Sequence, residues 1–145
     1  MIPVVAFHKS LERHKEIVQK IFDVMKIKEP KHMIIVLKWS KSRKKQYEGY
    51  IWQHGDKYPF PKMFRKFLPK YTYVMLLYLP KTPKKIQVRR LPYLLGHEYR
   101  HWIQMCIMDK IPYASEDDAN NWAFERIHEK VDELNEIIDE YENNV

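Results

Sequence analysis

The sequence predicts an α+β fold in which helices cover a small sheet. Amphipathic helical patterns stand near both ends of the chain, and three short apolar stretches lie between them. An apolar content of 45% is that of a folded globular protein. The expected order is therefore a helix, three strands and two helices, with an antiparallel or mixed sheet.

The N-terminal helix is expected over residues 10–27, with Ser10 as its N-cap. Pro30 follows and ends this unit. The apolar side chains of the segment recur at the helical period and predict a face that packs on the core, formed by Ile17, Val18, Ile21, Phe22, Val24 and Met25.

The three strands are expected over residues 32–39, 47–53 and 71–80. The first two are separated by a basic stretch, Ser40–Lys45, and this arrangement predicts that they pair as a hairpin. The third is strongly apolar and is expected at the centre of the sheet. Residues 54–64 carry two prolines and predict a loop before it.

Two helices are expected after the strands. The first begins near Thr82 or after Leu91 and continues to about Met108, and a turn follows it. The second begins at Ser115 and continues to about Tyr141 as one long C-terminal helix. Its predicted apolar stripe consists of Ile127, Val131, Leu134, Ile138 and Tyr141.

The size and composition of the chain limit its class. Its 145 residues suit one domain, residues 1–145. The one cysteine, Cys106, cannot form a disulfide within the chain or a cysteine-based zinc site, so a metal ion would need His, Asp or Glu. Because no apolar run is long enough to span a membrane and the first ten residues make a poor signal peptide, we expect a cytoplasmic protein without membrane contact. The frequent Lys, Glu and Tyr suit a thermophile.

Charge is divided unevenly along the chain. Residues 1–95 hold 22 Lys and Arg against 6 Asp and Glu, whereas residues 96–145 hold 4 against 13. This division predicts either two halves that attract each other or a basic N-terminal half that contacts nucleic acid. The stretch Lys38–Lys45 mixes residue types used for base stacking and phosphate binding, although a solvated charged loop would have the same composition.

The sequence His97-Glu98-Tyr99-Arg100-His101 lies within the predicted helix that ends near Met108. Residues four apart share one helix face, so His97 and His101 can bind the same metal ion. Glu98 is one position round the helix, where its carboxylate can act as general base on a metal-bound water. A tetrahedral zinc ion then needs a third protein ligand, which the motif itself does not supply.

The segment EDDANNWA, residues 116–123, follows the motif after a short connection. Together, the two segments resemble the minimal gluzincin metallopeptidases, which include the ImmA/IrrE-like proteins and, more loosely, the SprT-like ones. The resemblance covers residues 92–124. It implies that Glu116 is the third zinc ligand and that Asn120 supports a metal-bound histidine.

Ala119 and Ala123 match the small positions at which the two helices of such enzymes approach each other. Asp118 is the nearest alternative to Glu116 as ligand, and His128 is a more distant one. The acidic residues 116–118 could also be present only because negative charge stabilises a helix N-terminus. Arg100 departs from the family pattern, in which this position of the motif is uncharged. His54 and Tyr113 are further polar residues that could act on a substrate.

The predicted function is therefore that of a zinc-dependent peptidase of the gluzincin type. Zn²⁺ would be held by His97, His101 and Glu116, and Glu98 would activate the attacking water to cleave a protein or peptide substrate. The alternative is a nucleic-acid- or repressor-binding module in which the metal site is structural or vestigial.

Overall fold

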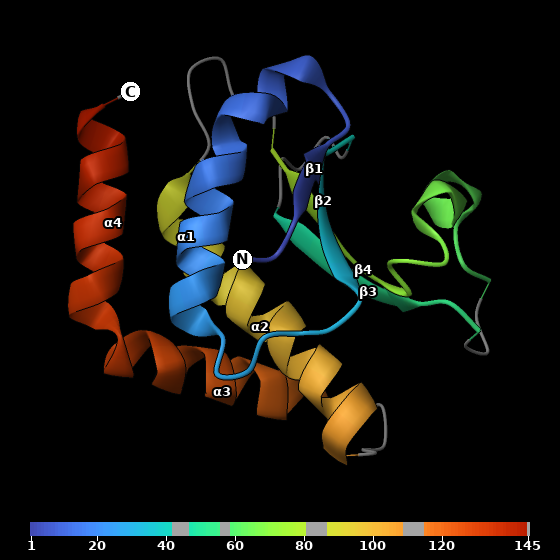
Figure 1. Ribbon diagram of the computed structural model, residues 1–145. Coiled ribbons are helices and arrows are strands. Elements are labelled where there is room, and N and C mark those ends of the chain that lie inside the picture. The colour runs from blue at the N-terminus through green and yellow to red at the C-terminus, as the bar shows by residue number, and fades with distance from the viewer. Residues whose placement is uncertain (42–46, 56–58, 81–86, 109–114, 145) are drawn as a thin grey trace.

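The computed structural model describes residues 1–41, 47–55, 59–80, 87–108 and 115–144 (Figure 1). Within these residues, four strands form one mixed sheet and four α-helices lie on one side of it. The α+β class and the N-terminal helix are thus as predicted, while the sheet has one strand more than the three expected. The strands are β1 (Val4–Ala6), β2 (Met33–Trp39), β3 (Glu48–Gln53) and β4 (Tyr73–Leu79).

The order of the strands across the sheet is β1-β2-β4-β3. β1 and β4 flank β2 and run parallel to it, and β3 runs antiparallel to β4. The central place of β4 confirms the prediction from its apolar sequence, since a strand between two others is covered on both faces. The predicted hairpin of β2 with β3 is wrong, because β4 lies between them. The additional strand, β1, has only three residues and gives too short a signal to be recognised in the sequence.

The helices are α1 (Lys15–Met25), α2 (Leu91–Ile103), α3 (Ser115–Glu129) and α4 (Val131–Asn143). α2 continues as a π-helical turn over Gln104–Met108, which matches the predicted end of the motif helix. Of the two predicted starts for that helix, the structure has the later one, at Leu91. Three predicted features lie outside the described residues: the earlier start at Thr82, residues 42–45 of the basic stretch, and the turn at 109–114. Within the described ranges, no helix is both long and apolar enough to cross a bilayer.

The N-terminal helix is entered through a 3-10 helix, η1 (Lys9–His14), and Ser10 is not its N-cap. The ring nitrogen Nδ1 of His8 accepts a hydrogen bond of 3.1 Å from the backbone N–H of Ser10 and so takes the capping role. The predicted apolar face is buried except at Val24, which is partly exposed. Arg126 of α3 donates to the carbonyls of Val24, Met25 and Lys26, so it satisfies the free C-terminal end of α1.

The predicted long C-terminal helix is two helices that meet at Lys130, where the backbone leaves helical geometry with φ −112° and ψ 20°. The two halves pack on different partners. α3 buries Ala119 and Ala123 against α2, whereas α4 lies alongside α1 and buries Leu134 and Ile138 (Figure 1). Val131, which the predicted stripe included, is 42% exposed because it stands at the bend.

The sheet separates two apolar cores. The larger core lies between the sheet and the helices, and a smaller one lies on the opposite face under the 3-10 helix η2 (Lys62–Phe67). Residues alternate between the two faces along each strand. On β3, Ile51 packs in the core beneath the helices while Trp52 packs in the smaller core.

Candidate metal centre

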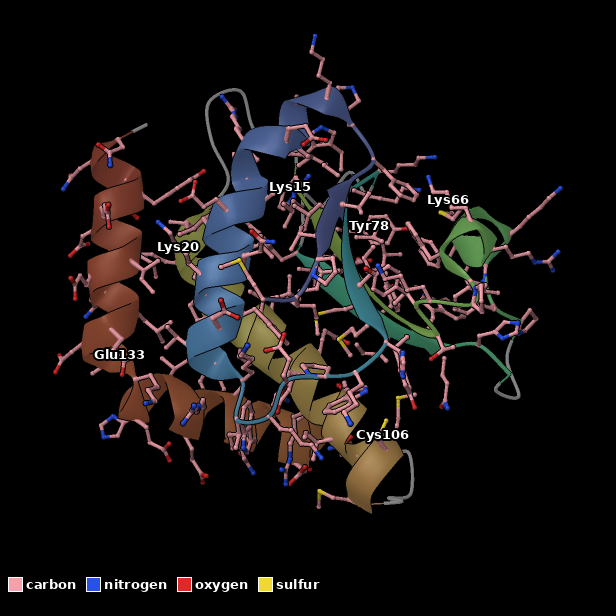
Figure 2. The ribbon with its side chains drawn as sticks, viewed as in Figure 1. Lys15, Lys20, Lys66, Tyr78, Cys106 and Glu133 are labelled. Carbon is pink, nitrogen blue, oxygen red and sulfur yellow. The ribbon has the colours of Figure 1, made fainter. Side chains whose placement is uncertain are left out.

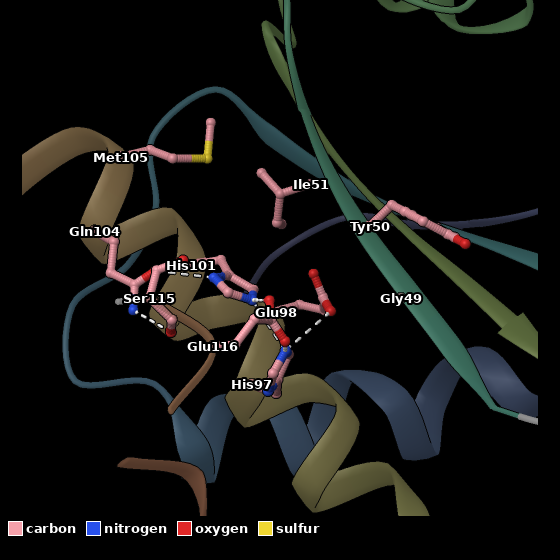
Figure 3. A pocket seen from close by; sticks show the side chains of 10 residues that line it. All are labelled: Gly49, Tyr50, Ile51, His97, Glu98, His101, Gln104, Met105, Ser115 and Glu116. Atoms are coloured by element: carbon pink, nitrogen blue, oxygen red, sulfur yellow. Dashed lines mark hydrogen bonds and ion pairs between the residues drawn. The ribbon is translucent and has the colours of Figure 1, made fainter. Parts of the chain in front are cut away.

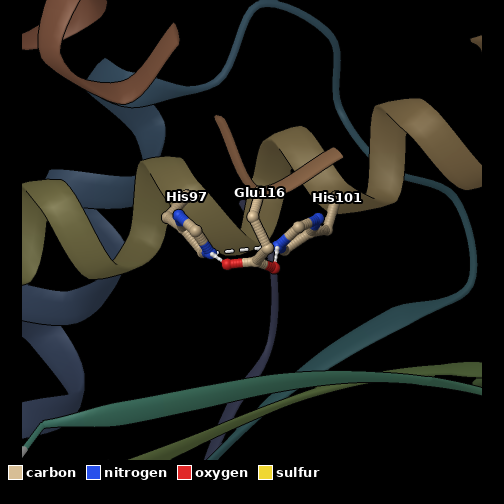
Figure 4. A group of neighbouring side chains, drawn as sticks. All are labelled: His97, His101 and Glu116. Atoms are coloured by element: carbon tan, nitrogen blue, oxygen red, sulfur yellow. Dashed lines mark hydrogen bonds and ion pairs between the residues drawn. The ribbon is translucent and has the colours of Figure 1, made fainter. Parts of the chain in front are cut away.

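The two histidines of the motif lie side by side on α2, as their spacing predicts. Their Nε2 atoms are 2.9 Å apart. The carboxylate of Glu116 reaches both from the first turn of α3, with Oε1 2.8 Å from Nε2 of His101 and Oε2 3.4 Å from Nε2 of His97. Figure 4 shows the three side chains pointing toward one another from the two helices.

This group of three residues could hold a metal ion. One ligand atom from each residue lies within 4.8 Å of the other two. Two ligand atoms of a tetrahedral zinc ion are about 3.3 Å apart, because each bond is about 2.0 to 2.1 Å long. The separations of 2.8, 2.9 and 3.4 Å scatter around this value. The donor set therefore fits a divalent cation of the zinc type.

Asp118, the nearest alternative ligand, faces away from this group and pairs with Arg100. Nε of Arg100 lies 2.7 Å from Oδ2 of Asp118, and Nη2 lies 3.2 Å from Oδ1, which is a two-pronged contact between α2 and α3. The charged residue that departs from the family pattern thus has a partner on the next helix. His128 lies farther along α3 and does not belong to the group of possible ligands.

Gln104 connects this ion pair to His101. Its side-chain oxygen lies 2.9 Å from Nδ1 of His101, and its nitrogen donates to Asp118 and to the backbone carbonyl of Ser115, both at 2.8 Å. Because an amide oxygen can only accept, Nδ1 of His101 carries the proton. The lone pair of Nε2 is then directed at the centre, as a metal ligand requires.

His97 has a different environment. Burial, and then the neighbouring charge of His101, lower the pKa of His97 and so favour the neutral imidazole that binds a metal. The nearby side chain of Asn120 raises this pKa. Nδ1 of His97 nevertheless has no well-formed hydrogen bond within the described part of the chain. Instead, Oδ1 of Asn120 accepts from the hydroxyl of Tyr93, whose ring centroid is 5.7 Å from that of His97. Support of a histidine by Asn120 stays a prediction.

Glu98 is buried beside the two histidines, with 5% of its surface exposed. Its Oε1 lies 3.9 Å from Nε2 of His97. Burial raises the pKa of Glu98 to about 8, and the negative charge of Glu116 contributes to the same shift. A carboxylate with so high a pKa exchanges protons near neutral pH, which is the property of a general acid or base.

Gly49 of β3 makes room for Glu98. A Cβ atom at this position would lie 2.6 Å from Cγ of Glu98 and 2.9 Å from its carboxyl carbon, closer than such atoms approach. Any other residue would therefore displace the carboxylate or the strand. In the sequence, Gly49 lies within the strand expected over residues 47–53 and has no evident role, because only the pairing of β3 with β4 brings it beneath α2.

The side chains of His97, Glu98, His101 and Glu116 open into a cleft of about 430 Å³ between α2 and β3. Figure 3 shows the carboxylate of Glu98 and the ring of His97 on the side of α2 that faces β3. Among the described strands, β3 pairs with β4 along one side only and forms an edge of the sheet. The cleft is lined by Gly49, Tyr50, Ile51, His97, Glu98, His101, Gln104, Met105, Ser115 and Glu116.

The close approach of α2 and α3 brings Glu116 to the histidines. Ala119 and Ala123 are fully buried, as the resemblance implies for small residues at the contact. Gly96 faces them, and a Cβ there would lie 3.3 Å from Cβ of Ala123 and 2.6 Å from the end of Met25. Of the two further candidate residues, His54 packs its ring on Phe60 and does not line the cleft, and Tyr113 lies outside the described residues.

Comparisons with models of known protein families, with characterised proteins and with solved structures give no match.

Proposed function

We propose that the protein is a zinc-dependent peptidase of the gluzincin type. The observation that carries this proposal is the convergence of two imidazole nitrogens and one carboxylate beside a second, buried carboxylate. A site that only holds a structural ion is usually closed by four protein ligands. Here three ligands face a cleft, and an ionisable group with a raised pKa stands next to them.

His97, His101 and Glu116 are the residues that would hold zinc. When bound, zinc supplies a Lewis acid that lowers the pKa of a water molecule and polarises a carbonyl group. Two neutral imidazoles and one carboxylate leave a net positive charge on the site, which favours a negatively charged transition state.

Glu98 is the proposed general base. Its carboxylate takes a proton from the attacking water and can return it to the leaving amine, so the proton moves through one side chain. Burial and the charge of Glu116 raise its pKa to about 8. A divalent cation bound a few ångströms away would act in the other direction, because positive charge favours the ionised carboxylate.

The edge of β3 that no described strand pairs with is the proposed binding site for the substrate backbone. An extended peptide can add to an exposed strand through main-chain hydrogen bonds, and Gly49 to Ile51 line the cleft opposite the histidines. A peptide added to this edge would lie beside Glu98, since Gly49 touches that carboxylate.

Arg100 is a positioning residue in this proposal. It fixes Asp118, Asp118 accepts from the amide of Gln104, and the oxygen of Gln104 accepts from His101. Such contacts orient a metal ligand and select its tautomer. The positive charge within the motif is thus neutralised on the side of α2 that faces α3, outside the group of ligands.

The test is the variant Glu98→Gln, which keeps the size of the side chain and removes its basicity. We expect about one equivalent of zinc in both proteins by elemental analysis, and at least a 100-fold lower rate of cleavage in the variant. Because the substrate is unknown, cleavage is measured on a degenerate peptide mixture by mass spectrometry. Glu125→Gln, the same change at an exposed position of α3, is the control. Full activity of Glu98→Gln, or a wild-type protein without zinc and without cleavage, contradicts the proposal.

A further inference from the structure

The face of the sheet opposite the helices carries a row of aromatic and basic side chains. Lys38 of β2, Tyr78 of β4 and Glu48 of β3 are partners in the register of the sheet. Tyr50 is the next residue of β3 on this face, because Gly49 and Ile51 face α2. Tyr78 therefore lies on the side of the sheet away from α1. Lys66 of η2 lies on the same side, as Figure 2 shows.

The aromatic part of this row is partly open to solvent, at Tyr50 more than at Tyr78. The rings of Tyr50 and Tyr78 meet edge to face, with centroids 6.1 Å apart and an interplanar angle of 86°. Tyr50 is 44% exposed, an unusual exposure for a large aromatic residue in a strand. The two rings border a hollow of about 350 Å³ that Lys41 and Trp52 also line.

The basic part of the row adjoins the aromatic part. The ammonium groups of Lys66 and Lys38 lie 4.6 and 5.7 Å from the centre of the Phe7 ring. Neither lysine forms an ion pair with a carboxylate in the described part of the chain. Two cations on one ring without a counter-ion repel each other, and an anion between them would remove that repulsion.

The sequence around this face is strongly basic. Residues 31–80 hold 11 Lys and Arg and 2 Asp and Glu, a net charge of +9. The one acidic side chain of the row, Glu48, lies at its end and accepts a hydrogen bond of 3.2 Å from the hydroxyl of Tyr50. Exposed cations also surround the covering helix η2, at Lys62, Arg65 and Lys70. The face is therefore complementary to a polyanion.

We propose that this surface, the basic aromatic face formed by Lys38, Lys41, Tyr50, Lys66 and Tyr78, binds single-stranded nucleic acid. Unpaired bases stack on exposed aromatic rings while lysines contact the phosphates. A duplex offers phosphates and no free base faces, and an acidic peptide offers no flat rings, so neither uses the tyrosines. Trp39 is not part of the surface, because it points into the core beneath the helices and its indole N–H donates to Ser10.

The basic aromatic face and the metal centre lie on opposite sides of the same strand. Gly49 of β3 contacts Glu98, whereas the next residue, Tyr50, directs its ring away from the metal centre (Figure 3). The inference is therefore independent of the proposed peptidase. If both proposals hold, a bound nucleic acid and a bound peptide lie on opposite sides of β3, separated by the thickness of that β-strand.

Binding is tested by fluorescence anisotropy with a labelled 20-nucleotide single strand of mixed sequence, a duplex of the same length and polyglutamate. We expect the single strand to bind most tightly, with an affinity that falls as salt rises. Lys38→Gln/Lys66→Gln should weaken binding about tenfold at low salt. It should also lower the slope of log affinity against log salt by about 1.4, because each lost phosphate contact contributes about 0.7.

Matched variants distinguish the contributions of ring stacking and of lysine position to binding from that of the net charge of the protein. Tyr50→Leu/Tyr78→Leu should weaken binding about tenfold, while Tyr50→Phe/Tyr78→Phe keeps it, since Phe retains the ring. Lys20→Gln/Lys130→Gln removes the same charge from α1 and from the junction of α3 and α4, and should change affinity less than twofold. Absence of binding to the single strand, equal binding of polyglutamate, or equal losses in both lysine pairs would overturn the proposal. Retention of binding by the leucine variant would do the same. Circular dichroism establishes that each variant is folded.

Discussion

The metal centre and the basic aromatic face differ in how their side chains are held. Around the metal centre, Arg100, Asp118 and Gln104 form a continuous chain of hydrogen bonds that ends on a ligand. On the basic aromatic face, Lys38 and Lys66 lie over the ring of Phe7, and Lys38 also donates to the sulfur of Met63. Chemistry requires atoms fixed to a fraction of an ångström, whereas a polyanion is bound by charge and ring area that tolerate motion. Substitutions should therefore have large, specific effects at the first site and small effects on folding at the second.

The largest effect is expected for Gly49→Ala. The new methyl group would meet Cγ of Glu98 at 2.6 Å and displace the general base, so cleavage should fall by about 100-fold or more while zinc remains bound. Gly55→Ala is the contrasting change, because a Cβ there meets no atom within 4 Å but φ is +89°. It should lower the free energy of unfolding by about 1 kcal/mol and leave the rate of cleavage intact. Equal losses of activity in the two variants would show that the methyl contact has no special role.

The next effect is a loss of stability in acid that depends on His14. This residue is 1% exposed, and its Nδ1 lies 2.8 Å from the hydroxyl of Tyr141 on α4. Burial, and then the charge of Arg13, lower its pKa to about 4 from the usual 6.5. Since the unfolded chain takes up a proton at higher pH than the folded one, the free energy of unfolding falls as pH drops from about 6.5 to 4.

The size of this loss is on the order of 3 kcal/mol, at about 1.4 kcal/mol for each pH unit. It is measured by urea unfolding of metal-free protein at pH 7 and pH 4.5. In His14→Phe the difference between the two pH values should shrink, because the titrating group is gone. An unchanged difference would assign the acid sensitivity to other groups.

Arg100→Gln should weaken zinc binding about tenfold, the lower end of the range for residues that support a metal ligand. Competition with a chromophoric chelator measures the affinity. Gln104→Ala should have a similar effect, and the double variant should be little worse than either single one, because both act through His101. Additive losses would contradict the proposed connection from Arg100 to His101.

The smallest effect concerns the basic aromatic face. Lys38→Gln/Lys66→Gln should change the free energy of unfolding by less than about 0.5 kcal/mol, since exposed charges contribute little to folding. Zinc content should be unchanged. Urea unfolding provides the value, and a loss of several kcal/mol would show that these lysines hold the sheet together.

The same contrast explains what the sequence could predict. The sequence predicts the three metal ligands His97, His101 and Glu116 because they lie in two segments close together in the chain. Helical spacing identifies the histidines, and the resemblance to gluzincins identifies the glutamate. The pairing of β3 with β4, the bend at Lys130 and the role of Gly49 depend on which surfaces meet, and no local pattern encodes them. Arg100 departs from the family pattern in the sequence, and its partner Asp118 can be identified only from the packing of α3 on α2.

The most direct test of the metal centre is anomalous scattering at the zinc edge from crystals of the zinc-loaded protein. We predict one strong peak within about 2.0 to 2.2 Å of Nε2 of His97, Nε2 of His101 and a carboxylate oxygen of Glu116. Asp118 should remain paired with Arg100. A peak bound by Asp118 in place of Glu116, or no peak near the two histidines, would contradict the proposed metal centre.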